Sequence, residues 1–240
     1  MTDAEAIGPV EPRLVTCVVI SWNSERFLGA AIESVLAQTH RPIEVLVVDA
    51  ESSDDSMRVA SSFPAPVRAL SIPDRGPTAT RNAGVSAARG EFVAFLDGDD
   101  LWHPDKLSRH MERFDERPQL DCSITLIQNF WDEGHELESD HYRDHRRMQP
   151  VAGYVMTASC VRRSVFDRVG MLDESLLFAD SADWFIRADR CEVVVELLPE
   201  VLTLHRLHGN NLSRRRAGES TAEFARVLKS RLDHQRRAPR

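Results

Sequence analysis

Apolar runs and helical stretches alternate between residues 14 and 97, and this alternation limits the possible folds of the chain more than any other feature. Four runs rich in β-branched residues have the length of strands, at residues 14–20, 43–49, 67–72 and 92–96. The three stretches between them carry apolar residues at helical spacing, as at Leu28, Ile32 and Val35. A strand, a helix and a second strand form a βαβ unit, which joins parallel strands. The sequence therefore predicts an α/β fold, a single Rossmann-like nucleotide-binding domain with a mostly parallel sheet flanked by helices.

The second half of the chain has weaker patterns. We expect helices at residues 104–117, 163–169 and 183–190 and strands at 121–127, 153–160 and 193–198. Residues 220–237 predict an amphipathic C-terminal helix, because apolar residues share one face at Phe224, Val227, Leu228 and Leu232. Residues 131–149 show little periodicity and form either a substrate loop or a solvated insertion. No G-x-G-x-x-G follows the first strand, which disfavours a dinucleotide ligand.

Three carboxylates follow the fourth apolar run within four residues, in Asp97-Gly98-Asp99-Asp100. Ligands of open α/β sheets bind at the carboxyl ends of the strands, where these acids are expected. Carboxylate oxygens are the ligands that hard divalent cations prefer. The alternative is an acidic turn that precedes the next helix. The two βαβ steps before this segment favour a metal–diphosphate site, with Asp100 as a helix cap.

The composition, 42% hydrophobic and 28% charged in 240 residues, is that of a soluble globular protein. No apolar run approaches the ~20 residues that span a bilayer. Residues 1–12 are too acidic and too rich in Pro and Gly for a signal peptide, so we expect a cytoplasmic protein with a disordered start. The four cysteines contain no C-x-x-C and predict reduced, mostly buried thiols, at Cys17, Cys122, Cys160 and Cys191.

The C-terminal region is basic although the net charge of the chain is −8: residues 206–240 hold ten Lys and Arg against three Asp and Glu. Such a region can contact an anionic membrane surface or an acidic partner, or it can be a solvated helix face. No motif of a nucleic-acid-binding module accompanies it, so a nucleic acid partner is not expected.

A series of short motifs runs in order along residues 14–213. It includes Ser21-Trp22-Asn23 after the first strand, Val47-Val48-Asp49 with Ser52-Ser53-Asp54, Arg81-Asn82-Ala83-Gly84, the Asp97-Gly98-Asp99-Asp100 segment, Asp183-Trp184-Phe185-Ile186-Arg187 and His208-Gly209-Asn210-Asn211. In this order the motifs resemble those of family 2 glycosyltransferases, which have the GT-A fold and a D-x-D metal site. The resemblance implies a glycosyltransferase domain at 13–213, made of a nucleotide-binding half (13–103) and an acceptor-binding half (104–213), before a basic tail at 214–240.

The resemblance also implies roles for single residues. Asp99 would bind Mn²⁺ or Mg²⁺ directly, and His208 would approach the metal from the C-terminal side, with His205 as a weaker candidate. Arg81 would pair with the diphosphate or with a carboxylate, and Trp22 would stack on the base. The residues implied in nucleotide binding are Ser21, Trp22, Asn23, Asp49, Glu51, Arg81, Asp97 and Gly98. A core or surface histidine remains the alternative for His208, and a half-buried aromatic for Trp22.

Three positions depart from the family pattern. Ser21 replaces the usual Pro, and Ala50 stands where an Asp usually accepts the imino proton of uracil, so Glu51 or a backbone carbonyl would have to replace it. Ser181 occupies the position of the Asp that deprotonates the acceptor, and a serine hydroxyl is a poor base at neutral pH. Asp180 is then the first candidate for the catalytic base and Asp183 the second, with helix capping as the alternative for Asp183.

The resemblance implies a metal-dependent, inverting glycosyltransferase of the hexosyltransferase type. It would move a sugar from a nucleotide sugar, UDP-linked in the first place, to an unidentified small molecule, glycan or peptide that lies against residues 131–158. A nucleotidyltransferase is one alternative, although the Gly-rich, Lys-bearing loop that it needs after the first strand is missing. A protein that binds nucleotide sugars with little or no transfer is the other, and it would account for Ala50 and Ser181 directly.

Overall fold

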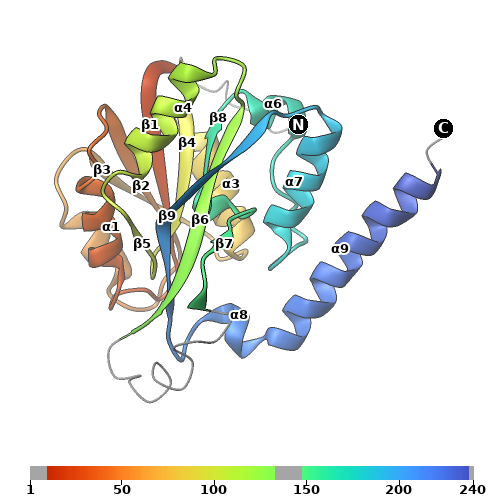
Figure 1. The fold of residues 1–240 in the computed structure, drawn as a ribbon. Helices are drawn as coiled ribbons and strands as arrows, with labels where there is room; N and C mark the ends of the chain where they lie inside the picture. Colours follow the sequence, from red (N-terminus) through yellow and green to blue (C-terminus); the bar gives the residue numbers. More distant parts are fainter. Residues whose placement is uncertain (1–9, 133–147, 238–240) are drawn as a thin grey trace, which may run out of the picture.

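Nine strands form one sheet in the computed structural model, which describes residues 10–132 and 148–237 (Figure 1). The order across the sheet is β3-β2-β1-β4-β8-β6-β9-β5, and β7 pairs with β6. The strands are β1 (Glu11–Ser21), β2 (Ile43–Ala50), β3 (Val67–Ile72), β4 (Gly90–Asp97), β5 (Leu101–Trp102), β6 (Cys122–Trp131), β7 (Val151–Ala152), β8 (Ser159–Arg162) and β9 (Val195–Leu207). All four strands predicted in the first half are present, and β1 begins within the segment expected to be disordered.

The four strands β1 to β4 pair in parallel, as the βαβ pattern predicts. Among the described residues, the other parallel pairing joins β6 and β9, and the antiparallel pairings are short. Since β1 lies between β2 and β4, the carboxyl ends of these three strands meet at one edge of the sheet. This edge holds the residues expected to bind the nucleotide.

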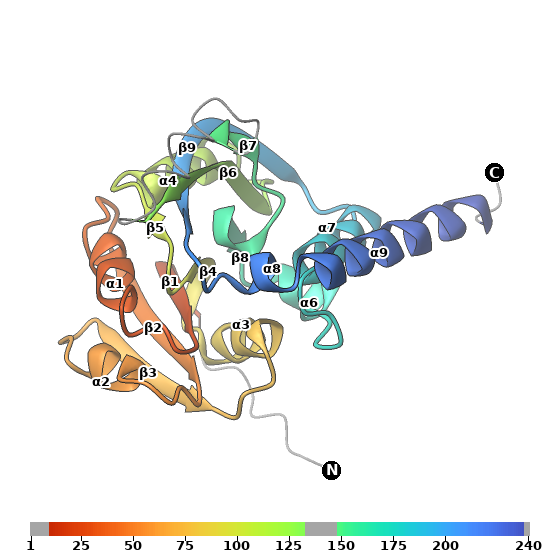
Figure 2. The same cartoon turned by 90° about the horizontal axis from the view of Figure 1, so that it is seen from below.

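Helices cover both faces of the sheet (Figure 2). They are α1 (Leu28–Leu36), α2 (Ser56–Ser61), α3 (Pro77–Ala87), α4 (Lys106–Glu116), α6 (Val165–Val169), α7 (Asp180–Arg190), α8 (Leu212–Arg215) and α9 (Ala217–Arg237). One core cluster joins alternate residues of β1, such as Val19, to α1, α2 and α4, and the other joins Val18 and Ile20 to α3, α6 and α7. Successive residues of β1 therefore point to opposite faces of the sheet and both faces are covered, which explains why residues 14–20 are nearly all apolar.

The prediction of a strand at residues 153–160 is wrong. A 3-10 turn, Met156–Ala158, precedes the shorter strand β8. The backbone groups of the turn bond to side chains instead of a neighbouring strand: Lys106 Nζ donates to the Thr157 carbonyl at 3.0 Å, and Met156 N donates to Ser181 Oγ at 3.2 Å. Contacts of this kind between distant residues leave no local sequence signal.

Other boundaries also differ. The strand expected at 193–198 continues past Pro199 as β9, with irregular register against β6 at Leu126, and the helix expected at 183–190 begins at Asp180. Asp100 does not cap a helix, because Asp105 precedes α4 and Asp100 is buried. Most of the loop expected at 131–149 lies outside the described residues.

The predicted C-terminal helix is present as α9, which extends away from the sheet in both views (Figures 1 and 2). Its first turns pack against α7 through Val227, while Phe224 and Leu228 are exposed. None of the helices in the described part of the chain is long and apolar enough to cross a membrane. Cys17, Cys122 and Cys160 are buried free thiols and Cys191 is an exposed one, which confirms the thiol prediction.

Candidate active site

The carboxyl ends of β1, β2 and β4 bring together three residues from distant parts of the sequence. Ser21 lies beside Asp49 in the β1–β2 register, and Ile20 lies beside Asp97 in the β1–β4 register. Gly98 N donates to the Ile20 carbonyl at 2.9 Å, and a Cβ at Gly98 would come within 2.9 Å of that oxygen. The glycine thus allows the acidic segment to turn tightly across the end of β1.

The loops after β1 and β2 are tied together by Asn23 and Asp49. Asn23 Oδ1 accepts a hydrogen bond from Ser53 N at 2.8 Å, and Asn23 N donates to Ser52 Oγ at 2.8 Å. The buried Asp49 carboxylate accepts from Ser52 N at 2.9 Å and Ser52 Oγ at 2.6 Å. Asn23 and Glu51 adopt positive φ angles of 49° and 46°. The polar groups of Asn23 and Asp49 therefore stabilise the loops after β1 and β2.

Trp22 and Glu51 are exposed to solvent. The Trp22 side chain is 51% exposed at the edge of the sheet, and so it is accessible to a stacking partner. Ala50 is buried, and its methyl group offers no acceptor. Ser21 is buried as well, and its hydroxyl has no hydrogen-bond partner among the described residues.

Arg81 of α3 joins the two halves of the site. Its Nη2 donates to Asp97 Oδ1 at 2.8 Å, and its Nη1 donates to Asp180 Oδ2 at 2.9 Å. Burial lowers the pKa of the guanidinium, but the two carboxylates outweigh burial and raise it. The sequence allowed two partners for Arg81, the diphosphate or a carboxylate. The structure shows the carboxylate contacts, and a contact with the diphosphate remains a prediction.

His208 reaches Asp99 from the end of β9. The distance between His208 Nε2 and Asp99 Oδ2 is 2.9 Å, and Asn211 Nδ2 donates to the same oxygen at 3.3 Å. Asn210 N donates to His208 Nδ1 at 3.2 Å, so Nε2 is the ring nitrogen that donates to Asp99. His208 is 7% exposed, and its ring lies 4.7 Å from that of Phe27. Residues more than 100 positions apart thereby meet at the predicted metal site.

Asp100 faces the interior and pairs with His205. Asp100 Oδ1 lies 3.0 Å from His205 Nδ1 and accepts from Arg206 N at 2.9 Å. Burial raises the pKa of Asp100 to about 6, and the Asp100 carboxylate raises the pKa of His205 to about 9. His205 therefore has a structural partner, and the pair fixes the acidic segment on β9.

The remaining two acids of this segment have shifted pKa values. Burial and the nearby Asp99 charge raise the pKa of Asp97, although Arg81 opposes this shift. Burial also disfavours ionisation of Asp99, but the hydrogen bond from His208 and the charge of His205 lower its pKa. Asp99 is thus the carboxylate held most firmly in its charged form, as a metal ligand must be.

No group of three or more His, Cys, Asp and Glu side chains within the described residues is arranged to hold a metal by itself. Mg²⁺ and similar cations, however, are commonly bound through one or two carboxylates and completed by substrate phosphates and water. The side chains of Asp99 and His208 offer one carboxylate and one imidazole within 2.9 Å of each other. This donor set fits a divalent cation shared with a diphosphate, and His208 Nε2 would give up the proton that it donates to Asp99 when the cation binds.

Arg206 supports the same segment, and sequence reasoning did not single it out. Its Nε donates to the Asp99 carbonyl at 2.9 Å and its Nη1 to Asp132 Oδ1 at 3.1 Å, while its guanidinium lies over the rings of Phe27 and Phe130. Asn211 was also missed. Both residues stand close to His208 in the sequence Arg206-Leu207-His208-Gly209-Asn210-Asn211. This proximity in sequence was the signal that could have identified them as site residues.

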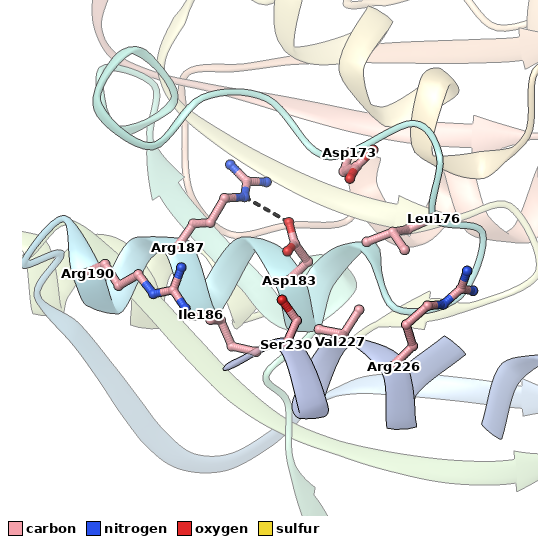
Figure 3. A pocket seen from close by; sticks show the side chains of 9 residues that line it. All are labelled: Asp173, Leu176, Asp183, Ile186, Arg187, Arg190, Arg226, Val227 and Ser230. Atoms are coloured by element: carbon pink, nitrogen blue, oxygen red, sulfur yellow. Dashed lines mark hydrogen bonds and ion pairs between the residues drawn. The ribbon is translucent and has the colours of Figure 1, made fainter. Parts of the chain in front are cut away.

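The two candidates for a catalytic base lie in different places. Asp180 is buried at the start of α7 and bonds to Arg81, whereas Ser181 Oγ accepts from Met156 N. Asp183 accepts from Arg187 Nε at 2.8 Å and lines a groove between α7 and α9 (Figure 3). Asp183 also lies inside α7, so it is not a helix cap. Asp180 is connected to the carboxyl edge through Arg81, which also bonds to Asp97.

Comparison with known proteins decides the family. A model described as glycosyl transferase family 2 matches residues 16–170. The chain belongs to glycosyl transferase family 2. An uncharacterized glycosyltransferase of Nostoc sp. (strain PCC 7120) is 30% identical over 218 residues, which cover 82% of this chain and 66% of the relative. The family resemblance predicted from the motifs is confirmed.

Solved structures at low identity share the fold of this family 2 member. TarS 1–349 of S. aureus in complex with UDP-GlcNAc has a TM-score of 0.72 at 18% identity, over 90% of this chain and 65% of that one. The mannosyltransferase PcManGT from Pyrobaculum calidifontis in complex with GDP-Man and Mn²⁺ has a TM-score of 0.66 at 19% identity, over 98% and 68%. These likenesses confirm the predicted GT-A type of α/β fold. The chain spans less than two thirds of the length of the first relatives that it matches.

Proposed function

We propose that the protein transfers a sugar from a nucleotide sugar, with a UDP-sugar as the first candidate, to an acceptor in a metal-dependent, inverting reaction. The observation that carries the proposal is the meeting of Asp97, Asp99 and His208 at the carboxyl edge, beside the loops that Asn23 and Asp49 hold. Structural neighbours in complex with UDP-GlcNAc or with GDP-Man and Mn²⁺ support the class of donor.

The donor half of the site would use residues that are accessible or charged. Trp22 would stack on the base, and Glu51 would take the place of the missing acceptor at Ala50. Asp99 and His208 would hold Mn²⁺ or Mg²⁺, which when bound neutralises charge on the diphosphate. Asp97 would bond to the ribose or to a water, and Arg81 would keep Asp97 in place.

The reaction would be a single displacement. The bond between the anomeric carbon and the diphosphate oxygen breaks, the acceptor oxygen bonds to the opposite face of that carbon, and the nucleoside diphosphate leaves. The acceptor proton would pass to Asp180, which we propose as the base because Ser181 cannot serve. The ion pair with Arg81 compensates the burial of this carboxylate.

A second candidate function is nucleotide-sugar binding with little transfer. Two observations favour it: Ser181 stands at the usual base position, and Asp180 is paired with Arg81. A direct test is isothermal titration with UDP-, GDP- and dTDP-sugars in the presence of Mn²⁺, followed by measurement of released nucleoside diphosphate. We expect binding of at least one UDP-sugar together with slow release. Binding without release supports the second candidate, and binding of none contradicts both. The acceptor, the cytoplasmic location and a membrane contact of α9 remain predictions.

A further inference from the structure

A buried carboxylate on α9 binds the segment that leads into α7. Glu223 Oε1 accepts hydrogen bonds from Phe178 N and Ala179 N, both at 2.7 Å, and Glu223 Oε2 accepts from Leu177 N at 3.2 Å. We call these contacts the Glu223 clasp. Although burial opposes ionisation, the three N–H donors lower the pKa of Glu223. A carboxylate with three such donors fixes the backbone that it binds.

The clasp lies at the place where α9 meets the rest of the chain. Val227, one helical turn after Glu223, packs with Leu176 and Ala179, and Ile186 of α7 packs against them. Figure 3 shows Leu176 and Val227 on the two sides of the groove between α7 and α9. The apolar contact and the clasp therefore act on the same short segment, residues 176–179.

Helix α3 also bonds to this segment and to the residues just before it. Thr78 Oγ1 donates to the Leu176 carbonyl at 2.6 Å, and Asn82 Nδ2 donates to the Leu172 carbonyl at 2.9 Å. The next residue after the segment is Asp180, whose Oδ2 accepts from Arg81 of α3 at 2.9 Å. Glu223 is thus connected to the site in three steps. Its hydrogen bonds hold the backbone of residues 177–179, the chain continues directly into Asp180, and Arg81 bonds to both Asp180 and Asp97.

We propose that Glu223 is a positioning residue of the active site, through which α9 sets the place of Asp180. The inference rests on the proposed function, because Asp180 is the proposed base. Among the described residues, those of the carboxyl edge make no contact with Glu223. Loss of the clasp would therefore lower kcat. The KM for the donor would stay the same, because Arg81 keeps its bond to Asp97 when Asp180 moves.

The test compares Glu223→Ala, Glu223→Gln and the control Glu219→Ala. The Gln variant keeps an oxygen for Phe178 and Ala179, whereas the Ala variant loses all three bonds. Glu219 is exposed on the same helix and pairs with Arg216. The activity is release of UDP from UDP-GlcNAc with Mn²⁺ and water as the acceptor, and the structural readout is amide hydrogen exchange of the full chain.

For Glu223→Ala we expect kcat to fall about 10- to 100-fold with an unchanged donor KM, as for a displaced catalytic group. Glu223→Gln should restore kcat to within about threefold, since it keeps the two shorter bonds. In the Ala variant, the amides of residues 177–179 and of the first turn of α7 should exchange at least about tenfold faster, and they should be unchanged in Glu219→Ala.

Two results would overturn the inference: unchanged exchange in the first turn of α7 in Glu223→Ala, or a wild-type kcat in this variant despite faster exchange at 177–179. If the wild type itself releases no UDP, the proposed function fails, and the exchange of the first turn of α7 still decides whether the clasp positions Asp180.

Discussion

The role of Asp180 can be tested with Asp180→Asn. The amide oxygen can still accept from Arg81 Nη1, which lies 2.9 Å from the carboxylate, so the side chain keeps its place and loses its charge. Replacing a charged acceptor by a neutral one should reduce the free energy of unfolding by about 1 kcal/mol, a loss of roughly 2–4 °C in Tm. Most of the effect should therefore appear in catalysis.

General bases contribute about 10²- to 10⁴-fold to rates. We expect kcat to fall at least about 100-fold in Asp180→Asn, the lower end of this range. The assay is release of UDP from UDP-GlcNAc, with donor affinity measured by titration. Asp183→Asn is the companion variant, and it should stay within about threefold of the wild type because Asp183 faces α9. An Asp180→Asn variant with more than a tenth of the wild-type kcat would refute the proposed base.

Two further predictions concern the core beneath the site. Burial lowers the pKa of Lys106 to about 7, below its unfolded value of 10.5, so the unfolded chain binds a proton between these pH values that the folded chain does not. The contribution of Lys106 to the free energy of unfolding should therefore rise by about 5 kcal/mol from pH 7 to pH 10.5. Lys106→Met should abolish this rise, as measured by denaturant unfolding at several pH values. The same pH dependence in both proteins would contradict the lowered pKa of Lys106. A Cβ at Gly84 would lie 2.3 Å from Val18 Cγ1, so Gly84→Ala should lower the free energy of unfolding by about 1–3 kcal/mol, as measured by thermal unfolding. Adding Val18→Ala should recover part of this loss, because it removes the clashing atoms. An unchanged Tm in Gly84→Ala alone would show that α3 shifts freely.

The nucleotide-binding half of the fold was predictable because its signals are local. The strands β1, β2 and β4 are mostly apolar since helices cover both of their faces, and the helices between the strands have clear apolar periodicity. The second half depends on distant contacts. Lys106 and Ser181 bond to the backbone of Met156–Ala158 and prevent a strand there, and the long strand β9 passes through Pro199, which local rules treat as an end.

The site shows the same division. The motifs predicted that His208 approaches Asp99, and the two side chains lie 2.9 Å apart. The partners of the other residues could not be read from the sequence: Asp100 pairs with His205 instead of capping a helix, and Arg81 bridges Asp97 and Asp180. Such pairs join residues about 16 to 105 positions apart, and only packing shows which charges share a buried space.

The central claim is that Asp99 and His208 bind a divalent cation together with the donor diphosphate. The most direct measurement is the affinity for UDP in the wild type and in Asp99→Asn, titrated with and without Mn²⁺. We predict that Mn²⁺ strengthens UDP binding to the wild type by at least about tenfold, and that Asp99→Asn loses this increase while it keeps the weak metal-independent binding. Equal UDP affinity with and without Mn²⁺, or an undiminished Mn²⁺ effect in Asp99→Asn, would contradict the claim.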